Sequence, residues 1–390
     1  MDNRFCLDLS SFSKELKLLV SLIGMKDAPE VPDHIKNYLT EEDMDWNQFV
    51  QLARHHRVYP TVYSKLSKFG NDLIPAEVVR ALYMDYNKNT FQMMHITAEM
   101  DKICKQFDEH NIRSLMLKGP VLAQALYGDI SLRTSKDLDI LIPVDDVDRA
   151  EKILLSSGYT ITDERPRILD DWKVKKHHIS YYNPQTKVQI EVHWRLNPET
   201  GKEPAFEELW ERRSTSSLTS YPVYFPGNED LFLYLVSHGA RHAWFRLRWL
   251  IDIDRMVRNK LDWGKLIPLL KEYHCSDLAG QALILASELI ETPLSQEMKT
   301  LTADKRPYRL AQSSIDFIKE IMRLSPTKHY KRYLLSIKSN HQKWNYMVGL
   351  MYPSSWDAQT LPLPKQLHFL YVPLRPILWI WRRMKQQVTP

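Results

Sequence analysis

The feature that most constrains the fold of this chain is a change in its hydrophobic pattern near residue 111. Over residues 1–110 apolar residues recur at intervals of three and four, which is typical of amphipathic helices. Short β-rich runs replace this pattern over residues 111–198, and the helical spacing returns over residues 199–390. The sequence therefore predicts the α+β class: a small mixed sheet as an α/β core, with a helical N-terminal unit and a helical C-terminal unit on either side.

The predicted core contains five short strands with helices between the first three of them. The expected order is strand, helix, strand, helix, strand and then a hairpin. The first helix is predicted over Val121–Tyr127, and the second begins with acidic residues and ends before Gly158. The predicted strands are Arg113–Leu117, Asp137–Ile142, Tyr159–Thr162, His178–Tyr182 and Val188–Trp194.

Composition and cysteine usage narrow the class of protein. The 390 residues are 44% hydrophobic and 26% charged, which is ordinary for a globular enzyme of two or three packed units. Cys6, Cys104 and Cys275 are isolated from one another and form no C-x-x-C pair, so neither a disulfide framework nor a zinc site is indicated. Charges scattered through the first residues argue against a secretory signal. We expect a soluble, cytoplasmic protein.

Positive charge is concentrated near the C-terminus. Residues 301–390 hold 15 Lys and Arg against 4 Asp and Glu. Such a basic tail can attract phosphate-bearing partners, among which nucleic acid is possible but not favoured, or it can be a solvated face that aids solubility.

The longest apolar stretch, Leu367–Trp381, contains two prolines and an arginine and is shorter than the roughly twenty residues that span a bilayer. We expect no transmembrane segment, and we expect this stretch to pack onto the protein's own core. The alternative is a weak contact with a membrane surface. The residues that would make it are Trp379, Trp381, Arg382, Arg383 and Lys385.

Three carboxylates are the strongest candidates for chemistry. Asp137 and Asp139 occupy strand positions i and i+2, so their side chains share one face. Neighbouring carboxylates repel one another unless a hard divalent cation such as Mg²⁺ (or Mn²⁺) lies between them. Glu191, in VQIEVHWRL, completes a three-carboxylate metal site if its strand lies beside that of the aspartates, and it can then take a proton from an acceptor hydroxyl.

A site of this kind supports in-line attack on the α-phosphate of a nucleoside triphosphate (NTP), with pyrophosphate leaving. Phosphates also need cationic and backbone donors. Four residues of the same segment are candidates for nucleotide binding, namely Lys118, Gly119, Arg133 and Lys136. The alternative is that Lys118 and Arg133 are solvated charges and that Gly119 only caps a strand.

Two further candidates for nucleotide binding are His238 and Arg241. Three-residue spacing on a predicted helix places both on one face, where they could hold the base or the acceptor. The alternative is mutual hydrogen bonding between buried helices. The His55-His56-Arg57 stretch is interpreted as structural at a helix end, and His177-His178 has no evident partner at metal-ligand spacing.

These motifs occur in a fixed order along the chain. The stretch LKGPVLAQALYGDISLRTSKDLDILIPVDDVDRAEKILLSSGY is followed by IEVHWRL and then by SHGARHAWFRLRWLIDIDR. Together with FVQLARHHRVYPTVYSKL upstream, they resemble the uncharacterised nucleotidyltransferase family of the polymerase-β-like superfamily over residues 40 to 260. The ordered combination of K-G, R-x-x-x-D-x-D and E-x-H-W is far more specific than any single piece.

The resemblance implies a two-metal active site with Asp137 and Asp139 as principal ligands, Glu191 as the third carboxylate and Lys118-Gly119 beside the triphosphate. The predicted activity is transfer of a nucleoside monophosphate from an NTP to an unidentified acceptor: a peptide, a saccharide or a small molecule. Relatives are found beside genes for polysaccharides and for ribosomally made peptides such as lasso peptides, so a lasso peptide-like or saccharide acceptor is a candidate.

One position departs from the superfamily. Pro120 follows Gly119, where Ser or Gly is usual, and proline has no N–H to offer phosphate. Two other functions stay open. One is a glycosyltransferase that uses the Asp-x-Asp pair under a sugar nucleotide, and the other is a catalytically inactive relative that binds nucleotide, RNA or peptide.

Overall fold

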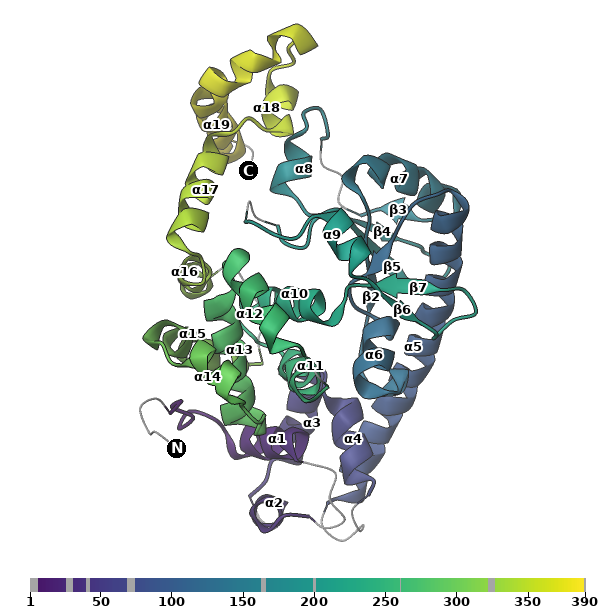
Figure 1. Cartoon of the computed structure of the whole chain (residues 1–390), viewed down its shortest axis with the longest axis vertical. Helices are drawn as coiled ribbons and strands as arrows, with labels where there is room; N and C mark the ends of the chain where they lie inside the picture. The colour runs from purple at the N-terminus through teal and green to yellow at the C-terminus, as the bar shows by residue number, and fades with distance from the viewer. Residues whose placement is uncertain are drawn as a thin grey trace.

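The protein has an α+β fold in which helices precede and follow a small mixed sheet (Figure 1). The sheet lies on one side of the molecule, and most of the C-terminal helices lie on the other. The computed structural model describes residues 6–25, 31–39, 43–68, 74–162, 166–198, 201–259, 261–321 and 327–388.

Five helices precede the sheet among the described residues. The last of them, α5, has 34 residues and runs along the outer side of the sheet (Figure 1). Helix α1 begins after Ser13, whose hydroxyl accepts a hydrogen bond from the Leu16 amide and so satisfies one exposed N–H of the first turn. The bounds are α1 (Lys14–Gly24), α2 (Asp33–Leu39), α3 (Trp46–His55), α4 (Tyr59–Leu66) and α5 (Ala76–Glu109).

The sheet has five strands in the order β1-β2-β5-β4-β3, and all five predicted strands are present. Strands β2 and β5 pair in parallel, whereas the other three pairs are antiparallel. The bounds are β1 (Leu115–Met116), β2 (Asp137–Leu141), β3 (Thr160–Ile161), β4 (His178–Tyr182) and β5 (Gln189–His193).

Alternation along β2 and β5 gives the sheet one apolar and one polar face. Leu138, Ile140, Ile190 and Val192 are fully buried, and α5 contacts β2. The carboxylates of these strands occupy the alternate positions and therefore point to the opposite face. The connecting elements are α6 (Pro120–Tyr127), η1 (Ile130–Leu132), η2 (Val144–Asp146), α7 (Val147–Ser156) and α8 (Asp171–Lys175).

The sequence predicts a helical region after residue 198, but the structure has a short hairpin within it. A two-stranded hairpin, β6 (Ser214–Ser216) and β7 (Val223–Phe225), follows α9 (Phe206–Glu211), and β7 contacts β1. Its strands have three residues each, which is too short for a period of two to be recognised in the sequence.

The later helices share one continuous hydrophobic core with the N-terminal helices and the sheet, and this core extends from Leu7 to Ile318. Helix α13 lies at its centre and contacts α1, α10, α11 and α15. The bounds are α10 (Asn228–Arg241), α11 (Leu247–Arg258), α12 (Trp263–Glu272), α13 (Ser276–Ile290), α14 (Gln296–Thr302) and α15 (Lys305–Ile318).

Residues 327–388 form a C-terminal arm that runs along the edge of the molecule and away from the core helices (Figure 1). Its elements are α16 (Lys328–Ser336), α17 (Asn340–Met351), α18 (Ser355–Thr360), η3 (Lys365–Leu370) and α19 (Tyr371–Val388).

The expectation that Leu367–Trp381 packs onto the main core is wrong. Within this stretch only Tyr371 and Leu378 are buried, in a separate small cluster with Ala358, and most of the other side chains are exposed. The side chains of Arg383 and Lys385 lie outside the described part of the structure. None of the described helices has the length and apolarity needed to cross a membrane.

Gly239 provides a test of the packing around α10. A methyl group at this position would lie 2.4 Å from the Trp244 ring, which is fully buried and has no room to move. We predict that Gly239→Ala lowers the free energy of unfolding by about 1–3 kcal/mol, measured by urea denaturation. Gly349→Ala in α17 is the control, because no heavy atom lies within 4 Å of the added methyl group. Equal stability of the two variants would contradict the packing described.

Candidate active site

The parallel pairing of β2 and β5 brings three carboxylates together. Asp139 lies directly opposite Glu191 in the register, and Asp137 lies opposite Gln189 on the same face. Asp139 is 1% exposed, whereas Asp137 and Glu191 are partly exposed. The strand of Glu191 therefore lies beside that of the two aspartates, which is the arrangement that a shared metal site requires.

Lys118 and His193 both contact Asp139. The Lys118 Nζ lies 3.1 Å from Asp139 Oδ1, and the His193 Nε2 lies 3.2 Å from the same oxygen. Burial acts to raise the pKa of Asp139, but Lys118 and His193 together hold it well below its ordinary value. Burial alone would lower the pKa of Lys118, but the Asp139 carboxylate, together with Tyr234 and Asp137, more than offsets this effect and raises it. Both groups are therefore charged at neutral pH.

Asp137 and Glu191 differ in their electrostatic surroundings. Burial and the neighbouring Asp139 carboxylate raise the pKa of Asp137, although the charges of Lys118 and Arg57 oppose this shift. For Glu191, burial acts in the raising direction, but the hydrogen bond with His193 and the interactions with the His178 and His193 rings together outweigh it, and the pKa of Glu191 is lowered. The two carboxylates thus respond oppositely to one site, Asp137 holding its proton more strongly and Glu191 less strongly than usual.

The donor atoms suit a divalent cation. A ligand atom of Asp139, one of Glu191 and one of His193 all lie within 4.8 Å of one another. Asp139 Oδ2 is buried and has no hydrogen-bond partner among the described residues. Burying such an acceptor unsatisfied is costly, so a cation at this oxygen would remove a penalty that the protein alone leaves in place.

Histidines extend the cluster in a way that the sequence analysis missed. His178 lies opposite His193 in the antiparallel register of β4 and β5, and ligand atoms of His177, His178 and His193 lie within 4.8 Å of one another. His177-His178 has no partner at metal-ligand spacing in the sequence, but the strand pairing brings His193 to both. Burial lowers the pKa of His178 to about 4 and that of His177 further, so both are neutral at pH 7. Pairing the two predicted strands as a hairpin in this register would have placed His178 opposite His193.

Helix α10 brings both of its predicted residues to this face of the sheet. Arg241 Nη1 lies 3.3 Å from His177 Nε2, and Arg241 Nη2 lies 3.2 Å from His238 Nδ1. Burial, followed by the charge of Lys118, lowers the pKa of His238 far below its ordinary value. Tyr234, one turn earlier on α10, places its ring centroid 5.9 Å from Lys118 Nζ.

The other predicted nucleotide-binding residues lie at the ends of β1 and β2. Gly119 has φ +88° and directly precedes α6, in a conformation that strains any other residue. Pro120 occupies the first position of α6, where a missing N–H costs the helix nothing. Lys136 is exposed immediately before β2.

Arg133 is placed differently from the other predicted residues. Its Nε and Nη2 each lie 2.9 Å from a carboxylate oxygen of Asp252, and both side chains are almost completely buried. The Tyr127 hydroxyl donates a further hydrogen bond to Asp252 at 2.8 Å. The two donors are therefore committed to a structural ion pair between η1 and α11, while Nη1 is buried without a hydrogen-bond partner among the described residues.

Arg57 was not predicted to belong to the site. Its backbone lies in the left-handed region, with φ 56°, at the end of α3, and the charges of Asp137 and Arg57 influence each other's pKa. The prediction of a structural role holds for His56, which is fully buried and accepts a hydrogen bond from the Leu247 amide at Nδ1. Because Arg57 and Asp137 are eighty residues apart, no local sequence pattern indicates that they lie close together.

A cavity of about 430 Å³ adjoins the cluster through Arg241, which forms part of its wall. Tyrosine and aliphatic side chains make up much of the remaining wall, and no acidic residue is among the described residues that line it. Five cationic side chains line it, namely Lys175, Lys202, Arg241, Lys338 and Arg375.

More than half of the chain matches a family of known proteins. The sequence model of a family described as "Uncharacterised nucleotidyltransferase" matches residues 42–291. The structure is similar to that of an antigenic nucleotidyltransferase-like protein from Paracoccidioides brasiliensis, at 16% identity and a TM-score of 0.32, over 58% of this chain and 93% of that chain. No curated protein matches. The C-terminal arm lies beyond the residues that the family model covers.

The buried ion pair gives a prediction that concerns stability. Asp252→Ala leaves the Arg133 guanidinium buried without its counter-ion, so we predict a loss of about 3–5 kcal/mol of unfolding free energy in urea denaturation. The exposed Arg113–Glu207 pair, with contacts of 2.6 Å, is the control, and Glu207→Ala should change stability little. A small effect of Asp252→Ala would show that the ion pair is not formed as described.

Proposed function

The chain belongs to the uncharacterised nucleotidyltransferase family, and from this premise we propose that it is a metal-dependent enzyme that transfers a nucleoside monophosphate from an NTP to an acceptor. The observation that carries the proposal is the convergence of Asp137, Asp139 and Glu191 on one face of two parallel strands, with Lys118 beside them. A structural role does not explain this cluster, because placing two partly buried carboxylates beside the buried Asp139 is costly.

Mg²⁺ or Mn²⁺ is the proposed cofactor, and the residues present fit it. Asp137, Asp139 and Glu191 would hold it, since oxygen ligands are those that these ions prefer. When bound, the cation neutralises charge on the entering and leaving oxygens of the transfer reaction. His193 contacts both Asp139 and Glu191, so it orients the two carboxylates through hydrogen bonds.

The triphosphate would lie along Lys118 and the first turn of α6. The Lys118 ammonium supplies positive charge, and the positive φ of Gly119 turns the backbone so that amides at the helix start can approach phosphate. Because Pro120 has no N–H, this turn offers one donor fewer than the superfamily pattern. Lys118 therefore carries a larger share of phosphate binding in this protein.

Glu191 is the proposed general base. Its Oε1 accepts a hydrogen bond from Gln189 Nε2 at 3.2 Å, which fixes the carboxylate, and its lowered pKa keeps it ionised at pH 7. An ionised carboxylate can accept the proton of an acceptor hydroxyl as the hydroxyl oxygen attacks the α-phosphate.

The acceptor would occupy the cavity beside Arg241. A cavity with cationic side chains and no acidic one among its described lining residues favours an anionic ligand. Its tyrosines and aliphatic side chains favour an apolar body attached to the anionic group. We therefore propose an acceptor that carries a phosphate or carboxylate on an apolar body, whether peptide, saccharide derivative or small molecule.

The first test concerns the metal and the nucleotide. Isothermal titration calorimetry with each NTP should show binding that requires Mg²⁺. Asp139→Asn removes a metal ligand and should weaken this binding by at least about 100-fold. Asp170→Asn is the matched control, because Asp170 is an exposed residue outside the site whose surface ion pair with Lys173 contributes little.

Three outcomes would contradict the proposal: no metal-dependent nucleotide binding by the unaltered protein, turnover of a sugar nucleotide without NTP, or RNA affinity that survives the loss of Asp137 and Asp139. The second would indicate a glycosyltransferase, although the sheet contains a single parallel strand pair among the described residues. The third would indicate an inactive binding relative.

The second test concerns the cavity. The probe is 4-nitrophenyl phosphate, an aromatic phosphate ester, titrated in the absence of NTP. Lys338 lines the cavity and is 6% exposed, and burial lowers its pKa to about 8. Lys338→Met keeps the aliphatic stem and removes the charge, so we predict about tenfold weaker probe binding and unchanged NTP binding. For the unaltered protein, probe affinity should fall as the pH rises through about 8, because the ammonium is then lost. Equal affinity of both proteins would contradict the acceptor assignment.

A further inference from the structure

In helix α19, Arg375 and Arg382 point inward, whereas many of the apolar residues are exposed. Arg375 and Arg382 lie 2.5 Å and 2.6 Å from the two oxygens of Asp357, which is fully buried in α18. Positions seven apart share a helix face, so the two arginines face inward. Ile377 and Ile380 lie on the opposite face and are 63% and 51% exposed. This helix is therefore amphipathic with its apolar side outward.

Helix α17 repeats this orientation. Trp344, Met347, Val348 and Met351 follow the i, i+3, i+4, i+7 spacing of a single stripe, and all four are exposed, with Trp344 the most at 68%. Its other side lines the cavity with polar residues such as Asn345. Helices α17 and α19 contact each other, so both apolar stripes belong to the same arm.

The exposed charge of the arm is positive. Residues 327–390 contain ten Lys and Arg and one acidic residue, which is Asp357. Because Asp357 is buried between Arg375 and Arg382, no carboxylate reaches the described surface of the arm. The exposed cations of its described side chains include Lys328, Lys331, Arg332, Lys343 and Lys365.

We propose that the C-terminal arm docks in the plane of a membrane surface that contains anionic phospholipid. The apolar stripes of α17 and α19 would enter the boundary between headgroups and acyl chains, and the lysines would meet the phosphates. Trp344, Trp379 and Trp381 are all exposed, and tryptophan prefers this depth of a bilayer. The proposal does not depend on nucleotide binding.

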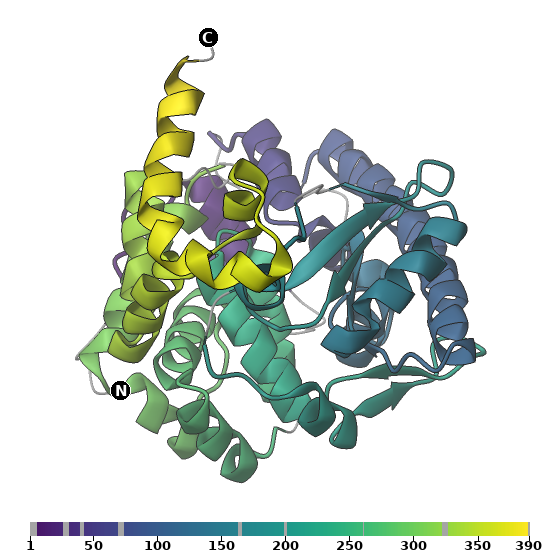
Figure 2. The ribbon, with the colours of Figure 1, turned by 90° about the horizontal axis from the view of Figure 1, so that it is seen from above.

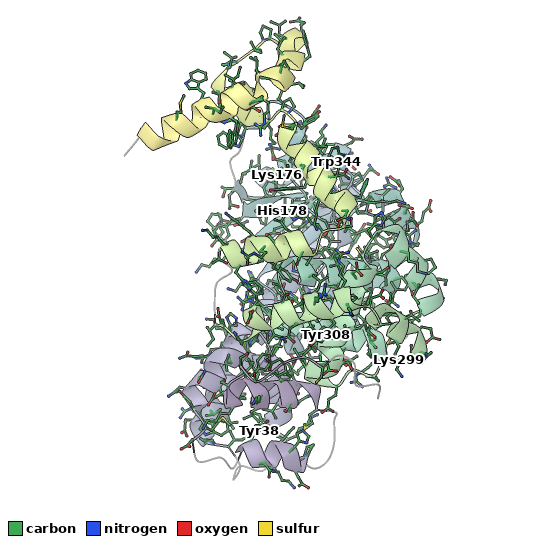
Figure 3. All side chains as sticks on the ribbon, turned by 90° about the vertical axis from the view of Figure 1, so that its left-hand side faces the viewer. Tyr38, Lys176, His178, Lys299, Tyr308 and Trp344 are labelled. Carbon is green, nitrogen blue, oxygen red and sulfur yellow. The ribbon has the colours of Figure 1, made fainter. Side chains whose placement is uncertain are left out.

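The shape of the arm suits a flat surface. Seen from above, α19 projects beyond the helices beneath it (Figure 2). Figure 3 shows α19 standing clear at the top of the molecule, with side chains all around it. A bilayer can therefore approach α19 without meeting the sheet or the core helices.

A protein partner fits these observations less well than a lipid surface. Lysine is depleted at the centre of protein interfaces, whereas here lysines accompany the apolar stripes. A second copy of the arm would bring the same positive charge and be repelled. An anionic bilayer satisfies both the charge and the apolar area with one surface.

The test is co-sedimentation of the full-length chain with vesicles of equal parts phosphatidylglycerol and phosphatidylcholine. We expect binding to these vesicles, much weaker binding to pure phosphatidylcholine, and a severalfold loss when NaCl is raised from about 0.1 M to about 0.5 M. The double variant I377S/I380S should lower the partition constant at least about tenfold, because two apolar side chains no longer enter the bilayer.

Matched controls separate this effect from a general loss of apolar surface or charge. Phe91→Ser removes an exposed aromatic residue of α5, on the opposite side of the molecule, and should leave vesicle binding unchanged (Figure 1). The double variant K343Q/K365Q should weaken binding to anionic vesicles, whereas K88Q/K105Q on α5 should not. Circular dichroism of each variant verifies that the fold is retained.

Several results would overturn the proposal. One is the absence of binding to anionic vesicles, and another is equal binding by I377S/I380S and the unaltered chain. A third is a dimer in analytical ultracentrifugation that I377S/I380S abolishes, without any vesicle binding, since the apolar stripes would then be a contact between two copies. Because the assay contains no nucleotide, none of these results bears on the transfer reaction.

Discussion

The parallel register of β2 and β5 is the constraint on which the rest of the site depends. Because side chains alternate between faces, a slip of one residue would move Glu191 into the core and expose Ile190. The burial of Leu138 and Ile140 against α5 resists such a slip. Hydrophobic packing on one face of the sheet therefore fixes the distance between the carboxylates on the other face, although the packed side chains do not contact these carboxylates.

The negative charge of the three carboxylates is balanced by cations that come from segments outside the five strands. Lys118 follows β1, Arg57 follows α3 and Arg241 ends α10, so cations from distant segments surround one acidic cluster. The end of α10 is itself held by the arm, since the hydroxyls of Tyr330 and Tyr333 in α16 donate hydrogen bonds to its last carbonyls. The helical units thus position the charges that make a buried carboxylate cluster tolerable.

The pairing of a buried carboxylate with cations also accounts for the orientation of the C-terminal arm. The apolar stripes of α17 and α19 face outward because the polar side of α17 lines the cavity and because Arg375 and Arg382 of α19 pair with Asp357. The apolar pattern of Leu367–Trp381 predicts a segment that covers the core. The pattern of a helix shows its two faces but not which face will pack inward, so the pairing of Arg375 and Arg382 with the buried Asp357 has no local signal in the sequence.

The sequence by itself determined the five strands, the side on which Asp137, Asp139 and Glu191 point, and the family, because period-two alternation and motif order are local properties of the chain. Only the tertiary structure decided which strands are neighbours, that His178 meets His193, that Arg133 pairs with Asp252 and that a short hairpin follows the sheet. These contacts join residues that are distant in sequence, and they are selected by packing and charge balance across the whole molecule, which no local pattern records.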